Sequence, residues 1–333
     1  MDSSNTYTHD QGVVVKKNTG IYHVRTNGRV LPCAITTRLR KQLIYPTADP
    51  TSLSHIVRDV KVLDKVDPVA VGDVVRFVDA HDGTGLIVEV LPRRNCLARQ
   101  APGTHQLEQI IASNVDYVIP VFAAANPTPK WAMLDRYLTA AESLELSALI
   151  VLTKLDLVTG PGTEPGAELL SAVDEYRRIG YPVILTSSVT GQGLDELRQA
   201  LKGRVVAFVG KSGVGKSALL NALEPGLGLR VGEVGTGNVG KGKHTTTHVE
   251  MVSTGFGADI VDTPGTREFG LPGMDEADLA LFFPEIRPLV GTCKFGLDCA
   301  HDEEPGCAIR KAVMDGKISP RRYQSYLRLK EEL

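Results

Sequence analysis

The segment Gly210–Ser217, with the sequence GKSGVGKS, constrains this chain more than any other. An apolar run, Val205–Val209, precedes it, and Ala218–Leu223 follows as a run typical of a helix. A strand, a glycine loop ending in Lys-Ser and a helix form the P-loop pattern, in which backbone N–H groups and the helix N-terminus hold phosphate oxygens. We expect Lys216 to reach the outer phosphates and the Ser217 hydroxyl to ligate Mg²⁺. The predicted phosphate-binding residues are Gly210, Lys211, Ser212, Gly213, Val214, Gly215, Lys216 and Ser217.

Two segments downstream of the P-loop are typical of GTPases among nucleotide-binding proteins. Asp262-Thr263-Pro264-Gly265 follows the largely apolar run Ala258–Val261, and a DxxG sequence after a strand senses the γ-phosphate and Mg²⁺, so Asp262 and Gly265 are candidate site residues. Between Glu224 and Lys243 lie seven glycines. We expect this segment to be switch I, which orders when a nearby threonine is captured by the γ-phosphate and Mg²⁺. A loop that never orders is the alternative.

Candidate guanine-reading residues lie upstream of the P-loop. Each of two apolar runs, 149–152 and 183–185, leads into a polar loop. The first loop, Thr153-Lys154-Leu155-Asp156, resembles the TKxD/NKxD motif, and the second, Thr186-Ser187-Ser188, resembles an SA-type guanine loop. On its own, the first could be an ordinary strand-to-loop exit.

The roles of these side chains follow from the chemistry of the base. The Asp156 carboxylate would accept hydrogen bonds from guanine N1–H and the 2-amino group, a pattern that adenine lacks. Lys154 would lie over the base and ribose, and backbone N–H groups near Ser187 and Ser188 would face the guanine carbonyl. Thr153 stands where asparagine is common. A hydroxyl offers fewer hydrogen bonds than an amide, so we expect a lower affinity for guanine.

The cysteines indicate a metal site. Three of the five lie in the pattern Cys293-x5-Cys299-x-His301-x5-Cys307. Three thiolates and one imidazole make a closed Cys₃His set, typical of a structural Zn²⁺ site, and Asp298 and Asp302 could orient the ligands. Buried free thiols are the alternative.

Sequence patterns divide the 333 residues into several parts. Short β-rich runs with turn signals, among them Asn27-Gly28, predict a small OB-fold barrel over 12–92. Strands alternating with helices over 109–271 predict an α/β domain with a mainly parallel sheet. A flexible tail (1–11), a linker (93–108) and a zinc-binding α-helical module with a basic C-terminal helix (272–333) complete the predicted organisation.

Charge and hydropathy indicate which partners and which compartment to expect. The net charge is −2, but residues 12–45 contain no acidic residue and carry Lys16, Lys17, Arg25, Arg29, Arg38, Arg40 and Lys41. This favours a surface for an RNA backbone over a merely hydrated face. A second basic run, 308–330, predicts a helix that faces RNA or solvent. Arg93 and Arg94 could touch RNA or stay hydrated. No apolar run approaches a membrane span and residues 1–11 lack a signal-peptide core, so we expect a cytoplasmic protein without membrane contact.

The motif order places the guanine-reading loops before the P-loop and the DxxG motif last, which is a circular permutation. This order and its flanks resemble the ribosome small subunit-dependent GTPase A (RsgA) family from about residue 12 to the end. The resemblance implies a zinc-containing GTPase that binds the small (30S) ribosomal subunit through 16S rRNA and acts in its late maturation. It also implies hydrolysis of GTP to GDP stimulated by that subunit. We expect a monomer.

The resemblance also selects residues in switch I. It implies that Thr246 ligates Mg²⁺ and that His244 serves in catalysis, since Thr266 is too short for the role of the glutamine that often follows DxxG. A solvent-facing His244 is the alternative. An RNA-binding assembly factor with a GTP-binding switch of negligible turnover remains open as a function, as does a small-molecule P-loop kinase, which the TKxD and DTPG sequences disfavour.

Overall fold

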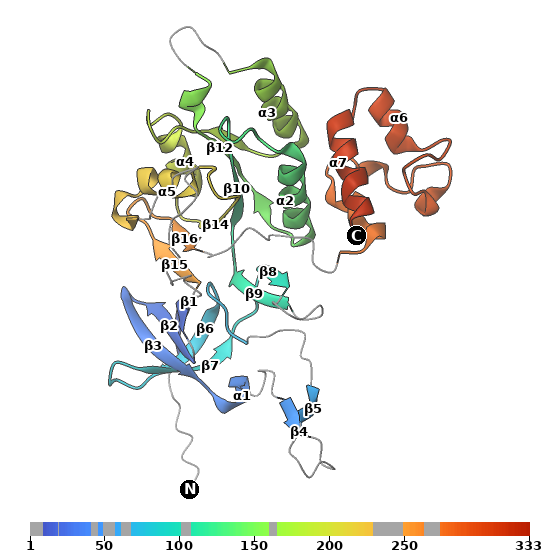
Figure 1. Cartoon of the computed structure of the whole chain (residues 1–333). Coiled ribbons are helices and arrows are strands. Elements are labelled where there is room, and N and C mark those ends of the chain that lie inside the picture. The colour runs from blue at the N-terminus through green and yellow to red at the C-terminus, as the bar shows by residue number, and fades with distance from the viewer. Residues whose placement is uncertain are drawn as a thin grey trace. The chain divides into compact units, whose positions relative to one another are not determined.

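The computed structural model describes residues 9–18, 20–40, 46–48, 57–60, 68–100, 108–159, 165–228, 249–262 and 274–333 (Figure 1). The chain forms two compact units. The first combines the N-terminal 115 residues with 243–253 and 259–265, and the second comprises 116–242, 254–258 and 266–333. The domain boundaries expected from the sequence stay a prediction.

The N-terminal strands form a closed five-stranded barrel in the order β1-β2-β3-β7-β6, with β6 pairing back to β1. Only β3 and β7 are parallel, and the others pair antiparallel, which is the strand order of an OB-fold. The predicted barrel is thereby confirmed. Its strands are β1 (Asp10–Asn18), β2 (Ile21–Thr26), β3 (Arg29–Ile35), β6 (Val74–Asp79) and β7 (Gly85–Val90).

The barrel closes around a single apolar core. Alternate residues of β3, Leu31, Cys33 and Ile35, are buried, because side chains of a strand face its two sides in turn. The turn predicted at Asn27-Gly28 joins β2 to β3, and both residues have the positive φ angles, 45° and 77°, that a tight hairpin turn needs. The core residues are Val14, Tyr22, Val24, Leu31, Cys33, Ile35, Leu39, Val69, Val75, Phe77 and Ile87.

Short elements surround the barrel: α1 (Thr37–Arg40), β4 (Pro46–Ala48), β5 (Val57–Val60), β8 (Cys96–Gln100) and β9 (Glu108–Ser113). Strand β8 lies inside the predicted linker and pairs antiparallel with β9. Arg93 forms an ion pair within the chain: its guanidinium binds both carboxylate oxygens of the buried Asp73 at 2.6 and 2.7 Å. Aspartate without such a partner would be costly at this position, so the ion pair explains the arginine.

Part of the positive charge of the acid-free segment is compensated among the described residues. Distant parts of the chain supply carboxylates: Lys16 pairs with Glu250 at 2.8 Å, Arg25 with Asp259 at 2.5 Å and Arg29 with Asp79 at 2.5 Å. Burial lowers the pKa of Lys17 to about 8. Arg38 and Arg40 on α1 are exposed, whereas Lys41 lies outside the described residues.

The two partner carboxylates Glu250 and Asp259 belong to a hairpin far along the chain. Strands β15 (Glu250–Ser253) and β16 (Asp259–Asp262) pair antiparallel, with Glu250 opposite Asp262 and Ser253 opposite Asp259. Barrel strand β1 pairs antiparallel with β15 through Lys16 and Glu250. A register shift in β1 between Val14 and Lys16 accompanies this change of partner.

The second unit contains a parallel sheet in the order β13-β12-β10-β14, with β11 beside β10. This confirms the predicted α/β domain with a parallel sheet. Its strands are β10 (Tyr117–Ala123), β11 (Ser147–Ala148), β12 (Ile150–Thr153), β13 (Val183–Leu185) and β14 (Val205–Val209). Strand β14 is apolar along its whole length, and β12 is apolar up to its last residue, Thr153, as expected when both faces of a parallel sheet are covered.

Four helices accompany the sheet: α2 (Trp131–Ser143), α3 (Ala167–Ile179), α4 (Leu194–Leu201) and α5 (Lys216–Leu223). Each apolar face is buried, for example Leu194, Leu197 and Leu201 on α4. Helix α3 begins at Ala167, with Gly166 at its N-cap position. Within the described part of the chain, no helix is both long and apolar enough to cross a bilayer.

The C-terminal module consists of short 3₁₀ turns and two helices, α6 (Ala308–Met314) and α7 (Pro320–Glu331). Leu279, Phe283, Ile286 and Ile309 form its core together with Tyr326 and the three clustered cysteines. The basic run 308–330 was expected to be a helix facing RNA or solvent. It is two helices joined by a turn, and part of its charge points inward.

Helix α7 lies beside α2 of the parallel-sheet domain (Figure 1). Arg322 of α7 is only 1% exposed and binds the fully buried Asp135 of α2 at 2.7 Å. Its other nitrogens bind Glu285 at 2.6 and 3.1 Å. Its neighbour Arg321 pairs with Glu175 of α3 at 2.6 Å. These arginines therefore join the module to the domain instead of facing RNA.

Tyr176 and Trp131 of the parallel-sheet domain also contact the residues of this junction. The Tyr176 hydroxyl donates to Asp135 at 2.6 Å and accepts from Arg321 at 2.9 Å. The Arg321 guanidinium lies 4.9 Å from the ring centre of Tyr176 and 5.6 Å from that of Trp131. Burial would lower the pKa of Arg322, but the carboxylates of Asp135 and Glu285 outweigh burial and raise it. The Arg322 guanidinium therefore stays charged at neutral pH.

Candidate nucleotide and metal sites

The P-loop connects β14 to α5, as the sequence predicts. Gly210, Gly213 and Gly215 have φ angles of 148°, 83° and 96°, which side chains rarely adopt. A Cβ at Gly210 would lie 2.5 Å from the Val121 carbonyl oxygen, so this glycine is required for the loop to approach β10. The Lys216 ammonium donates to the carbonyls of Gly210 and Lys211 at 2.5 and 3.0 Å, so it lies across the loop.

Thr153 and Lys154 lie against the P-loop. The Thr153 hydroxyl is within hydrogen-bonding reach of the Val214 and Phe122 carbonyls. The Lys154 ammonium donates to the Gly213 carbonyl at 2.7 Å and also to the Asn126 carbonyl. The single hydroxyl proton of Thr153 can serve only one carbonyl at a time. Threonine at this position nevertheless ties the loop of β12 to the phosphate-binding loop.

Asp156 and Ser187 come together although 31 residues separate them. The Ser187 hydroxyl donates to an Asp156 carboxylate oxygen at 2.5 Å and accepts from the N–H groups of Val189 and Thr190 at 3.2 and 3.1 Å. This fixes the carboxylate that is proposed to read guanine. The Ser187 N–H donates to the Gln192 carbonyl, so it is not available to a base. The Ser188 N–H has no partner within the described residues.

Three further candidate residues of the nucleotide site cannot be located. His244, Thr246 and Gly265 lie outside the described residues, and only the backbone of Asp262, as the last residue of β16, is described. Sequence reasoning missed Asn126, whose carbonyl holds Lys154. A polar residue just after the apolar strand β10 was the available signal, because strand ends of a parallel sheet carry such sites.

The four predicted metal ligands converge. The ligand atoms of Cys293, Cys299, His301 and Cys307 lie within 4.8 Å of one another, and all four residues are buried. Cys293 Sγ and Cys307 Sγ are 3.9 Å apart, and His301 Nδ1 lies 3.5 and 3.7 Å from them. A tetrahedral Zn²⁺ with bonds of about 2.3 Å to sulfur and about 2.0–2.1 Å to nitrogen requires edges of about 3.8 and 3.6 Å. The separations of Cys293, Cys307 and His301 therefore fit zinc, and the Cys299 sulfur lies within 4.8 Å of these three donors.

Backbone N–H groups face two of the three ligand sulfur atoms. The backbone N–H groups of Ala308 and Arg310 donate to Cys293 Sγ and Cys307 Sγ at 3.2 and 3.5 Å. Burial raises the pKa of the Cys299 thiol to about 11, so a metal ion must displace its proton at neutral pH. These donors and the closed ligand set are those of a structural site.

Ligand orientation comes from residues other than the two predicted aspartates. The Glu304 carboxylate accepts from the N–H groups of Ala300 and Asp302 at 2.8 and 3.0 Å, on either side of His301. The Tyr323 hydroxyl of α7 donates to the His301 carbonyl at 2.7 Å. Sequence reasoning missed Glu304 because carboxylates are frequent around the cluster and spacing alone does not select one.

Removing the metal should therefore loosen the junction with the domain. We expect one zinc per chain, and expect chelation to change the fluorescence of the single tryptophan, Trp131, because Tyr323 and Arg321 share helix α7. Cys307→Ala should lose the zinc, and Cys96→Ala, in β8 and outside the cluster, should keep it. Zinc below about a tenth of an equivalent in wild-type protein that remains folded would contradict the assignment.

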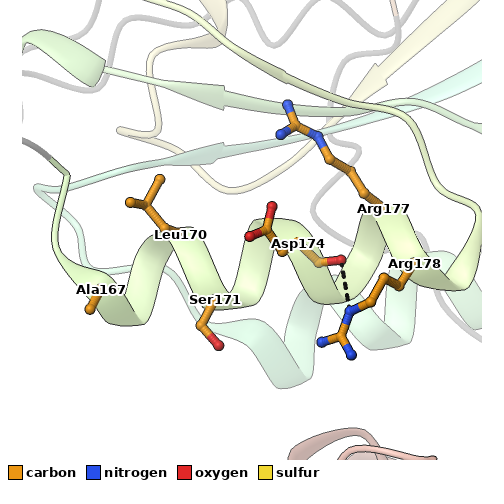
Figure 2. Close-up of a pocket in the computed structure, with 6 residues that line it drawn as sticks. All are labelled: Ala167, Leu170, Ser171, Asp174, Arg177 and Arg178. Atoms are coloured by element: carbon orange, nitrogen blue, oxygen red, sulfur yellow. Dashed lines mark hydrogen bonds between the residues drawn. The ribbon is translucent and has the colours of Figure 1, made fainter.

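Figure 2 shows a shallow pocket on α3, an element that contributes none of the candidate site residues. Arg178 donates to the backbone carbonyl of Asp174 within it, and Leu170 is partly exposed. Its lining is Ala167, Leu170, Ser171, Asp174, Arg177 and Arg178. This mixed surface lacks the glycine loops and converging donors of the P-loop region, so we assign the nucleotide to the latter.

Comparisons with known proteins agree with this geometry. A family model described as RsgA GTPase matches residues 90–272. The Small ribosomal subunit biogenesis GTPase RsgA of Gemmatimonas aurantiaca is 47% identical over 267 residues, 80% of this chain and 84% of that protein. The protein of the same name from Bacteroides fragilis is 36% identical over 323 residues, 97% of this chain and 96% of that protein.

Solved structures give the same result. The crystal structure of YjeQ from Thermotoga maritima superposes with a TM-score of 0.73 at 30% identity, covering 98% of this chain and 99% of that one. YloQ, described as a circularly permuted GTPase, superposes with a TM-score of 0.71 at 29% identity, covering 100% and 97%. The permuted motif order is thus found in a solved relative with the same fold.

Proposed function

Because this chain belongs to the RsgA GTPase family, we propose that it binds the small ribosomal subunit in its GTP state during late maturation and leaves after hydrolysis. The chain is a GTP hydrolase, as its family and relatives are. One observation carries the proposal: Thr153 and Lys154 of the guanine motif contact the P-loop directly, so motifs in permuted order form one nucleotide site.

In this site we assign each candidate residue a role. Lys216 neutralises the outer phosphates, and Ser217 and Thr246 hold Mg²⁺, which neutralises charge developing on the γ-phosphate. Asp262 and Gly265 sense that phosphate. Lys154 and Asp156 hold the base, with Ser187 orienting the carboxylate and the Ser188 N–H offered to the guanine carbonyl.

The barrel and the C-terminal module have roles of their own outside the nucleotide site. We propose that the barrel contacts 16S rRNA, with Arg38 and Arg40 among its exposed cations. Zn²⁺ bound by Cys293, Cys299, His301 and Cys307 is structural and holds the C-terminal module. The protein acts as a monomer in the cytoplasm, without membrane contact.

A second function, an RNA-binding assembly factor whose switch hardly turns over, is favoured by one observation. Thr266 stands where many GTPases carry the glutamine that orients water. Phosphate release with and without purified small subunits separates the two functions, because only the enzyme should be stimulated.

We propose that His244 replaces that glutamine. His244→Ala should lower stimulated turnover by about 10²-fold, since losing a group that positions water typically costs this much. The affinity for GTP should change little, because the histidine would act on water rather than on the nucleotide. His9→Ala, in the N-terminal tail, is the control. A stimulated rate unchanged in His244→Ala would make His244 a solvent-facing residue.

A further inference from the structure

The hairpin β15–β16 connects the two candidate nucleotide-sensing segments of the chain. It follows directly after the threonines 245–247 of the predicted switch I, and its last residue is Asp262, the first residue of the DxxG motif. Whatever fixes the two strands therefore fixes the positions from which both nucleotide-sensing segments start. In the described first unit, the OB-fold barrel does this.

The contact between barrel and hairpin begins with backbone pairing. The first half of β1 pairs with β6 inside the barrel, whereas Lys16 in its second half pairs with Glu250 of β15. The Lys16 ammonium also binds the Glu250 carboxylate at 2.8 Å. Strand β1 thus belongs to the barrel and to the hairpin at once, so movement of one strand must involve the other.

A second contact holds the other strand. Arg25 of β2 binds both carboxylate oxygens of Asp259 on β16, at 2.8 and 2.5 Å. The Ser253 hydroxyl of β15 accepts from Arg25 and donates to Asp259 at 2.6 Å. Such two-pronged arginine–carboxylate pairs fix orientation as well as distance. Burial would raise the pKa of Asp259, but the hydrogen bonds from Arg25 and Ser253 lower it, so the carboxylate stays ionised at neutral pH.

Arg25 lies in the barrel, and its partner Asp259 lies three residues before Asp262 on strand β16. Three residues of extended chain span only about 10 Å, with no turn to absorb a displacement. The C-terminal module, by contrast, is held through α2 and α3, the helices that follow β10 and the guanine motif. The barrel is thus the appendage anchored to the strand of the γ-phosphate sensor.

We propose that Arg25 is a positioning residue for GTP hydrolysis: by clamping Asp259 and Ser253 it sets strand β16 and couples a partner held by the barrel to the DxxG motif. The coupling to the small subunit rests on the proposed function. The positioning of β16 by Arg25 does not rest on it, because all the residues involved belong to this chain. Coupling between sites is typically worth 5- to 150-fold in an equilibrium, and we expect a change of this size in stimulated turnover.

The test compares Arg25→Ala with Arg76→Ala. Arg76 pairs with Glu89 at 2.8 Å between two barrel strands, so its variant removes a barrel ion pair that does not reach the hairpin. At saturating small subunits, Arg25→Ala should lower kcat at least 5-fold and leave KM for GTP within about twofold. Arg76→Ala should match wild type. Equal kcat in the two variants would overturn the proposal.

A charge exchange separates positioning from direct contact with RNA. Arg25→Asp combined with Asp259→Arg restores the pair, so it should recover a large part of the kcat that Arg25→Asp loses. If Arg25 instead binds RNA directly, the double variant should be as poor as the single one, which would refute the proposal. If wild type shows no stimulation, the proposed function fails. Basal kcat then decides the inference, because Arg25→Ala should still lie below Arg76→Ala.

Discussion

Asp156→Asn should abolish most of the discrimination between guanine and adenine nucleotides. The Asp156 carboxylate, fixed by the Ser187 hydroxyl at 2.5 Å, offers two acceptors to guanine N1–H and its 2-amino group. The amide of the variant offers one acceptor and an NH₂ group that meets the 2-amino group donor to donor. Sites built on such hydrogen bonds reject a mismatched partner by about 10⁴-fold. We expect the ratio of GTP to ATP affinity to fall by a factor approaching that value.

Competition binding against labelled GTP measures this ratio. Asp195→Asn, an exposed aspartate on α4 paired with Arg198, is the matched control and should keep wild-type selectivity. Xanthosine triphosphate, which carries a carbonyl in place of the 2-amino group, should bind the Asp156→Asn variant and show that its site is intact. If ATP competes as well as GTP does in wild type, the guanine assignment is wrong.

Arg322→Ala should lower the free energy of unfolding by about 3–5 kcal/mol, because it breaks a buried ion pair and removes the closest cation from the Asp135 carboxylate. Asp135 is fully buried, and Glu285 loses both of its hydrogen bonds from the same guanidinium. The nucleotide site is not part of this junction, so the effect should be on stability. Denaturant unfolding followed by Trp131 fluorescence reports it, since Trp131 contacts Arg321 and Tyr176 at the junction.

The same junction contains a control. Arg287 pairs with Glu142 of α2 at 2.6 Å, but its side chain is 48% exposed. Arg287→Ala should therefore cost less than about 1 kcal/mol, as exposed ion pairs do. Similar losses in Arg322→Ala and Arg287→Ala would mean that the buried network does not hold the C-terminal module.

Local patterns suffice to predict most of the fold. The glycine loop after an apolar strand predicts the P-loop connection of β14 and α5, and Asn27-Gly28 predicts the turn between β2 and β3. The spacing of Cys293, Cys299, His301 and Cys307 predicts a cluster whose donor atoms do converge. In each case the residues that determine the structure are close in sequence, so geometry follows from spacing.

Ion-pair partners far apart in sequence could not be predicted in this way. Arg322 and Asp135 are separated by 187 residues, and Arg25 and Asp259 by 234. Before the fold is known, nothing distinguishes Arg322 from the exposed cations of the same basic run. The prediction that this run faces RNA or solvent was therefore wrong for Arg321 and Arg322, because packing of α7 on α2 decides their surroundings.

The central claim is a GTPase that the small ribosomal subunit stimulates, and steady-state phosphate release from GTP, titrated with purified small subunits, tests it most directly. Large subunits at the same concentrations serve as the control for nonspecific RNA. The account predicts slow release alone, a rise by orders of magnitude that saturates with small subunits, and no comparable rise with large subunits. Release that stays at its basal rate at every small-subunit concentration, while GTP remains bound, would contradict it and leave a nucleotide switch without turnover.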